Sequence, residues 1–216
     1  MKIGLVGRMR SGKDTVAEMI ADELGSGRTA IVGFADNVRW VAELTGKPGE
    51  RKDLQAIGEK MREVSPTFWI DALFYDLTGF DEEHVVVKDV RHVNEAAALR
   101  AAGYHIVRVH AYDLDRFVRS GLDHLEWLSV AEHSTETESA LIVGDYTIMN
   151  TADKVYLQQQ TRSALREIRR FEREAIQGNL PPAATGRSAC GCNEQRGCGS
   201  NGGGSAGERG DTCCKC

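Results

Sequence analysis

Short apolar runs alternate with amphipathic segments along residues 1–177. Five runs rich in β-branched residues predict buried strands, at Lys2–Val6, Thr29–Val32, His84–Val90, His105–His110 and Tyr146–Met149. Between them, apolar side chains recur at helical spacing, most plainly over residues 13–24 and 154–177. Strands that alternate with helices predict an α/β fold of three layers, in which helices flank a parallel β-sheet with right-handed crossovers.

Two segments interrupt this alternation. Gly46, Pro48 and Gly49 break the chain before a charged, helix-rich stretch at residues 52–77, so we expect a helical insertion at about residues 46–80. Residues 111–139 are polar and irregular with short helical pieces, as in a closing lid.

From residue 179 the chain is rich in glycine, serine and cysteine and has almost no large apolar residue. Such a composition cannot bury a core, so we expect one domain at residues 1–178 and a disordered tail at 179–216. All six cysteines lie between Cys190 and Cys216. Zinc binding by this array stays open, although it lacks paired C-x-x-C spacing.

Charge and composition exclude several classes of protein. A net charge of −5 argues against a nonspecific nucleic-acid binder, which needs a basic face. No apolar run is long enough to span a bilayer, and Met1–Val6 leads directly into a strand without a signal peptide. Because residues 1–189 contain no cysteine, we expect a cytoplasmic protein.

The segment Gly7–Lys13 (GRMRSGK) fits the pattern G-x-x-x-x-G-K between a strand and a helix. Glycines let backbone N–H groups turn toward phosphate oxygens, and the lysine reaches the β- and γ-phosphates. Asp14 stands where the strict pattern has serine or threonine, and Thr15 follows, so either side chain could meet Mg²⁺. The predicted ATP-binding residues are Gly7, Arg10, Ser11, Gly12, Lys13, Asp14 and Thr15.

A second group of charged residues follows the strand His84–Val90. In parallel sheets, ligands bind at the carboxyl ends of strands. Asp89 can hold Mg²⁺ there, as the Walker-B acid does, and Arg91 can contact a transferred phosphoryl group. The alternative is that Asp89 caps a helix and Arg91 is a solvated neighbour.

Several segments, in order, resemble phage-type deoxynucleoside monophosphate kinases over residues 1–175. The loop GRMRSGKDT resembles that family's loop, with its unusual Lys-Asp-Thr ending. The other similar segments are Phe34–Asp36 with Arg39, Leu54–Gly58 with Arg62, Phe68–Leu73, VKDVRHVNE at 87–95, HSTE at 133–136 and GDYTIMN at 144–150.

The resemblance implies a P-loop NTPase fold and phosphorylation of deoxynucleoside monophosphates by ATP with Mg²⁺. It implies catalytic roles for Lys13, Arg91 and Asp89, and Mg²⁺ contacts from Asp14, Thr15 or Asp89. The implied acceptor-binding residues are Asp36, Arg39, Arg62, Trp69 and Glu136, and the implied lid residues are Arg116 and Arg119. Trp69 could instead be a core residue, Glu136 a surface charge, and the lid arginines a solvated face.

Two rival functions stay open. A kinase resembling dephospho-CoA kinase would phosphorylate a neutral hydroxyl and need Asp89 as base. A nucleotide-binding module without transfer would not gather arginines at the phosphate loop. The implied partners are ATP and a deoxynucleoside monophosphate, without nucleic acid or membrane, and a homodimer is left open. Asn150 is expected to end a strand and Asp153 to cap the last helix.

Overall fold

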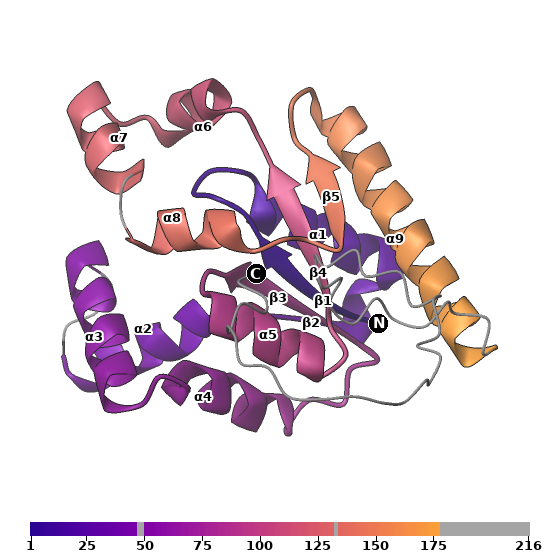
Figure 1. Ribbon diagram of the computed structural model, residues 1–216, viewed down its shortest axis with the longest axis horizontal. Helices are drawn as coiled ribbons and strands as arrows, with labels where there is room; N and C mark the ends of the chain where they lie inside the picture. Colours follow the sequence, from indigo (N-terminus) through magenta and orange to yellow (C-terminus); the bar gives the residue numbers. More distant parts are fainter. Residues whose placement is uncertain (47–49, 132–133, 178–216) are drawn as a thin grey trace, which may run out of the picture. The chain divides into compact units, whose positions relative to one another are not determined.

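The computed structural model describes residues 1–46, 50–131 and 134–177, which belong to one compact unit, Met1–Asn179 (Figure 1). The predicted tail lies outside the described residues. The strands are β1 (Lys2–Val6), β2 (Thr29–Val32), β3 (His84–Val90), β4 (His105–His110) and β5 (Tyr146–Met149). The helices are α1 (Lys13–Leu24), α2 (Phe34–Leu44), α3 (Arg51–Val64), α4 (Phe68–Leu77), α5 (Val93–Ala101), α6 (Asp113–Ser120), α7 (His124–Ala131), α8 (Ser134–Leu141) and α9 (Lys154–Ile176), with a short 3₁₀ helix at Ser26–Arg28.

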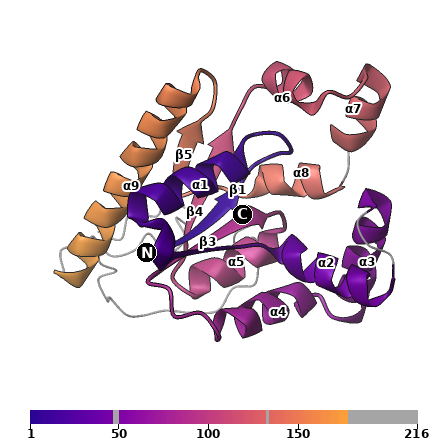
Figure 2. The same cartoon turned by 180° about the vertical axis from the view of Figure 1, so that it is seen from behind.

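The five strands form one parallel sheet in the order β2-β3-β1-β4-β5. All five lie where the apolar runs predict them, because continuous apolar sequence is typical of a sheet covered on both faces. Helices α1 and α9 cover one face, and α5 lies on the other with α2 and α4 (Figures 1 and 2). The predicted three-layer α/β fold is therefore confirmed.

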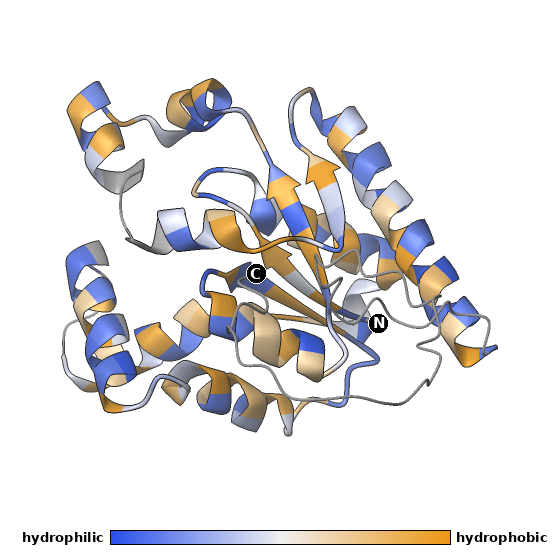
Figure 3. Cartoon of the chain, viewed as in Figure 1, coloured by the Kyte–Doolittle hydropathy of each residue, from blue (hydrophilic) through white to orange (hydrophobic). Residues whose placement is uncertain are grey.

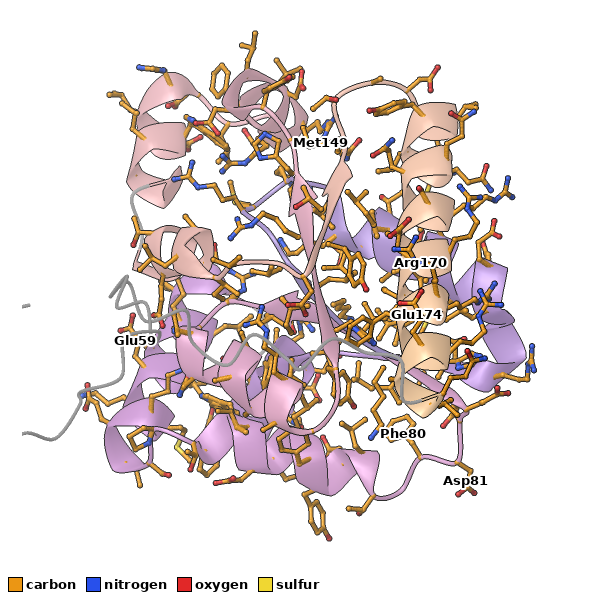
Figure 4. All side chains as sticks on the ribbon, turned by 45° about the vertical axis from the view of Figure 1, so that its right-hand side comes forward. Glu59, Phe80, Asp81, Met149, Arg170 and Glu174 are labelled. Atoms are coloured by element: carbon orange, nitrogen blue, oxygen red, sulfur yellow. The ribbon has the colours of Figure 1, made fainter. Side chains whose placement is uncertain are left out.

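The two faces of the sheet have separate cores, because successive strand side chains point to opposite sides. Ile3 and Leu5 of β1 pack with α1 and α9, whereas Val6 packs with α2, α4 and α5. Figure 3 shows the apolar strands at the centre and polar positions along the outer helix surfaces, such as that of α9. Arg170 and Glu174 lie one turn apart on α9, with 3.5 Å between Arg170 Nε and Glu174 Oε1 (Figure 4).

The two interrupting segments are helical, as their sequence indicates. The stretch at 52–77 consists of α3 and α4, which are separated at residues 65–67. The segment at 111–139, which we expect to be irregular with short helical pieces, holds α6, α7 and most of α8. In the described part of the chain, no helix is both long and apolar enough to cross a membrane.

Candidate active site

The phosphate loop connects the end of β1 to the start of α1. Two of its residues have positive φ, Arg10 at 60° and Gly12 at 95°. A left-handed turn at a helix start forms a concave site for anions, with the positive end of the helix behind it. A β-carbon on Gly7 would lie 2.4 Å from the Val109 carbonyl oxygen, and one on Gly12 would lie 2.4 Å from Asn150 Nδ2. Both glycines are therefore required by close packing.

Two polar side chains of this loop fit a phosphate ligand. Lys13 Nζ donates hydrogen bonds to the carbonyl oxygens of Gly7 (2.6 Å) and Arg8 (3.1 Å), so the cation lies over the loop where phosphate oxygens would bind. The Ser11 side chain is buried, and its Oγ has no hydrogen-bond partner among the described residues. A buried hydroxyl in that condition is suited to a polar ligand.

Asn150, at the end of β5, holds the phosphate loop in place. Its side-chain amide donates to the Ser11 carbonyl oxygen at 2.8 Å, and its backbone N–H donates to the His110 carbonyl oxygen at 2.7 Å. Sequence reasoning gave Asn150 no role in the site, because its partner lies 139 positions earlier in the chain. Asp153 caps α9 as predicted, accepting the Tyr156 N–H at 2.8 Å.

A cavity of about 310 Å³ lies beside this loop, between α2, α3 and the end of β3. Three cationic side chains line it: Arg39 from α2, Arg62 from α3 and Arg91 beyond β3. Met9 belongs to the phosphate loop and also lines the cavity. The apolar part of the lining comes from Phe34, Val38 and Leu54, and Gln55, Glu59, Asp89 and Glu95 add polar groups.

Asp89 joins the cavity to the start of α2. Its two carboxylate oxygens accept the backbone N–H groups of Phe34 at 2.8 Å and Ala35 at 2.9 Å. Burial raises the pKa of Asp89, against the opposing effects of the Ala35 hydrogen bond, the Arg91 cation and the Phe34 hydrogen bond. A β-carbon on Gly33 would lie 2.9 Å from this carboxylate. Asp89 therefore caps α2 from a strand distant in sequence.

Glu95 is a residue of this cavity that sequence reasoning did not assign to the site, although it belongs to the run VKDVRHVNE. Its side chain is 3% exposed, and Oε2 accepts the backbone N–H groups of Arg91 (2.9 Å) and His92 (3.0 Å). Oε1 lies 3.4 Å from Arg62 Nη2. Burial raises the pKa of Glu95, and the nearby His92 and Arg62 oppose that shift. Glu95 thus fixes the backbone at Arg91 and the side chain of Arg62.

Of the residues predicted to bind the acceptor, Asp36 and Trp69 do not line the cavity, and the side chain of a third is not among the described ones. Asp36 pairs with Arg39 (2.6 Å) and Lys88 (3.5 Å) outside the cavity lining. Trp69 is 2% exposed, and its indole N–H donates to the Gly58 carbonyl oxygen at 3.0 Å. Because the ring is buried in the core, its predicted stacking on a base is replaced by a packing role. The side chain of Glu136 is outside the described part.

The two arginines predicted to belong to a lid connect α6 to the phosphate loop and to the residue after β5. Arg116 is 1% exposed; its Nε donates to the Met9 carbonyl oxygen at 2.9 Å, and Nη1 lies 2.6 Å from Asp113. The Trp127 ring lies 5.1 Å from its guanidinium. Arg119 Nη2 donates to the Asn150 carbonyl oxygen at 3.3 Å. Arg116 is therefore buried against the phosphate loop, which excludes the solvated-face alternative for it.

The donor groups near the loop fit a Mg²⁺ ion held together with nucleotide phosphates. Asp14 is exposed in the first turn of α1, and Thr15 follows it. Within the described ranges, no cluster of three or more acidic, histidine or cysteine side chains could hold a metal ion. Mg²⁺ typically uses only one or two protein carboxylates plus substrate phosphates. The candidates that the sequence predicts for such an ion are Asp14, Thr15 or Asp89.

Neither a known protein family nor a curated protein matches this sequence. Many solved structures share the fold, and two of them serve as examples. TT1252 from Thermus thermophilus is 17% identical with a TM-score of 0.54, over 78% of this chain and 97% of that one. Shikimate kinase from Bacteroides thetaiotaomicron is 14% identical with a TM-score of 0.50, over 78% and 98%. The likeness is one of fold, an α/β architecture in which helices flank a parallel sheet.

Proposed function

We propose that this protein is an ATP-dependent kinase that transfers the γ-phosphoryl group of ATP to the phosphate of a deoxynucleoside monophosphate. The observation that carries the proposal is the convergence of Arg39, Arg62 and Arg91 on one cavity beside the phosphate loop. Three cations suit an acceptor that is itself an anion, because two anions must approach each other during transfer.

The remaining cavity lining supports a nucleotide as the acceptor. Phe34, Val38 and Leu54 offer an apolar wall for a base, and Gln55 and Glu59 offer polar groups for its edge. The choice of a deoxynucleotide rests on the sequence resemblance to phage-type deoxynucleoside monophosphate kinases described above.

In the proposed reaction an acceptor phosphate oxygen attacks the γ-phosphorus, and the bond from that phosphorus to the β,γ-bridging oxygen breaks, releasing ADP. The attacking oxygen is already anionic, so no strong base is required. Lys13 stabilises charge on the β- and γ-phosphates, while Arg62 and Arg91 screen the repulsion from the acceptor. Bound Mg²⁺ would neutralise phosphate charge, held by Asp14, Thr15 or Asp89.

The geometry favours this reaction over its two rivals. A hydroxyl acceptor would need a base such as Asp89, whereas three arginines around the cavity suit an acceptor that is already anionic. A module that only binds a nucleotide has no need for three arginines around a cavity beside the phosphate loop.

The test is ADP release from ATP and Mg²⁺ with each deoxynucleotide, each ribonucleotide and dephospho-CoA offered separately. We expect turnover that depends on a deoxynucleoside monophosphate. Lys13→Ala should lower it about 100-fold or more, as expected for a lost transition-state donor. Lys154→Ala, at the exposed start of α9, is the matched control and should leave it unchanged.

The alternative outcomes separate the rivals. Turnover with dephospho-CoA and with no mononucleotide would show that the acceptor is a hydroxyl group and not a nucleotide phosphate. ATP binding without turnover on any acceptor would instead identify a nucleotide-binding module.

A further inference from the structure

Helix α8 contacts the acceptor side of the site through Glu138, a residue without a role in the reaction described above. Glu138 Oε2 lies 2.7 Å from His92 Nδ1, and Oε1 accepts the Val93 backbone N–H at 3.0 Å. His92 is the N-cap of α5, and Val93 is its first residue. Two oxygens of one carboxylate therefore bind the start of α5, where an anion is stabilised by the unpaired N–H groups and the helix dipole.

The same turn of α5 carries the groups that face the acceptor cavity. Arg91 immediately precedes the N-cap, and Glu95 accepts the N–H groups of both Arg91 and His92. Glu95 also pairs with Arg62. A continuous set of contacts thus runs from Glu138 through the start of α5 to two of the three cavity arginines.

Glu138 extends from a helix whose end is fixed to the sheet. The Arg108 guanidinium, from β4, donates to the carbonyl oxygens of Ser139 (3.3 Å) and Ala140 (3.2 Å), and also to that of Ile142. Cationic groups at the last carbonyls of a helix stabilise its end. Arg108 therefore holds the C-terminal part of α8 while Glu138 holds the start of α5.

We infer that Glu138 is a positioning residue for the acceptor phosphate, acting through His92 and Val93 on Arg91 and Arg62. The inference rests on the proposed function. We expect its consequence to be selective, because Glu138 binds the start of α5, whereas Asn150 and Arg116 bind the phosphate loop. Loss of the Glu138 carboxylate should weaken acceptor binding and leave ATP binding intact.

The experiment compares wild type, Glu138→Ala and Glu138→Gln by steady-state kinetics, varying ATP and the acceptor deoxynucleotide in turn. Glu138→Ala should raise the KM for the acceptor about tenfold, the effect of losing a charge-assisted hydrogen bond, with the KM for ATP changed less than about twofold. Glu138→Gln keeps an acceptor for the Val93 N–H and should show a smaller rise. Glu23→Ala, which removes an ion pair to Arg162 on the α1–α9 side, should change neither constant.

Thermal unfolding shows whether each variant folds. If Glu138→Ala does not fold, the acceptor KM of Glu138→Gln tests the inference. An unchanged acceptor KM, or an equal rise in both constants, would overturn the positioning role while leaving the proposed function standing. A wild-type protein without turnover on any mononucleotide would overturn the proposed function, and this inference with it.

Discussion

Single contacts between distant residues give the phosphate loop its shape. Gly12 has φ of 95° and lies directly against the Asn150 amide, whose Nδ2 also donates to the Ser11 carbonyl oxygen. A side chain at position 12 would meet a backbone penalty and a collision together. The glycine spacing of the motif therefore reflects the close approach of Asn150 as well as that of phosphate.

Gly12→Ala should distort the loop and separate it from Asn150. We expect ATP affinity to fall at least about tenfold and the free energy of unfolding to fall by about 1–2 kcal/mol or more, from the positive φ alone. Calorimetric ATP titration and thermal unfolding measure the two effects. Gly27→Ala is the matched control, because no atom lies within 4 Å of a β-carbon there. Equal effects at both positions would refute this account.

The helices of the predicted lid segment contact two different parts of the candidate site. Helix α6 is attached to the phosphate loop through Arg116, whereas α8 is attached to the start of α5 through Glu138. The predicted lid segment therefore contacts both the phosphate loop and the start of α5. Under the proposed function, this arrangement would couple the placement of ATP to that of the acceptor.

Arg116→Met should loosen α6 from the phosphate loop. The Met9 carbonyl oxygen loses its donor, so we expect unfolding free energy to fall by about 1–3 kcal/mol, the range for hydrogen bonds to charged groups. Hydrogen exchange in residues 7–12 should become faster, and ATP affinity should fall. Arg170→Met is the control, since its ion pairs on α9 are exposed and worth less than about 1 kcal/mol. Unchanged exchange in the loop would exclude the anchoring role.

Across the whole molecule, stability depends on pH through buried and paired carboxylates. Burial alone would raise the pKa of Glu138, but hydrogen bonds from Val93 and His92 lower it below the ordinary value of 4.5. A lowered folded pKa stabilises the protein above the unfolded pKa, and the contribution is lost as the pH falls through the folded value. Asp89 and Glu95 have raised pKa values and contribute in the opposite direction.

Glu138→Gln should isolate the Glu138 contribution, because Asp89 and Glu95 are present in both proteins. We expect wild type to have the higher Tm at about pH 7, and the difference to shrink as the pH falls below 4.5. Calorimetric unfolding between about pH 3 and pH 7 measures it. A Tm difference that stayed constant across this range would contradict the assigned ionisation.

Local sequence determined the elements and the phosphate loop. The five apolar runs became five strands with the predicted bounds, and Asp153 caps α9 as expected. Both outcomes depend on residues within a few positions of each other, since strand alternation and helix capping are short-range effects. The P-loop pattern was readable for the same reason.

Tertiary structure alone decided which side chains meet across the site. Trp69 has an aromatic side chain suited to stacking, yet packing places it in the core with its N–H on Gly58. The contacts of Asn150 with Ser11, and of Arg116 with Met9, join residues more than 100 positions apart. Glu138 binds the start of α5, and Arg108 of β4 binds the end of the same helix, α8. No local pattern specifies such pairs, because the partner of a polar group is set by where the sheet brings the chain together.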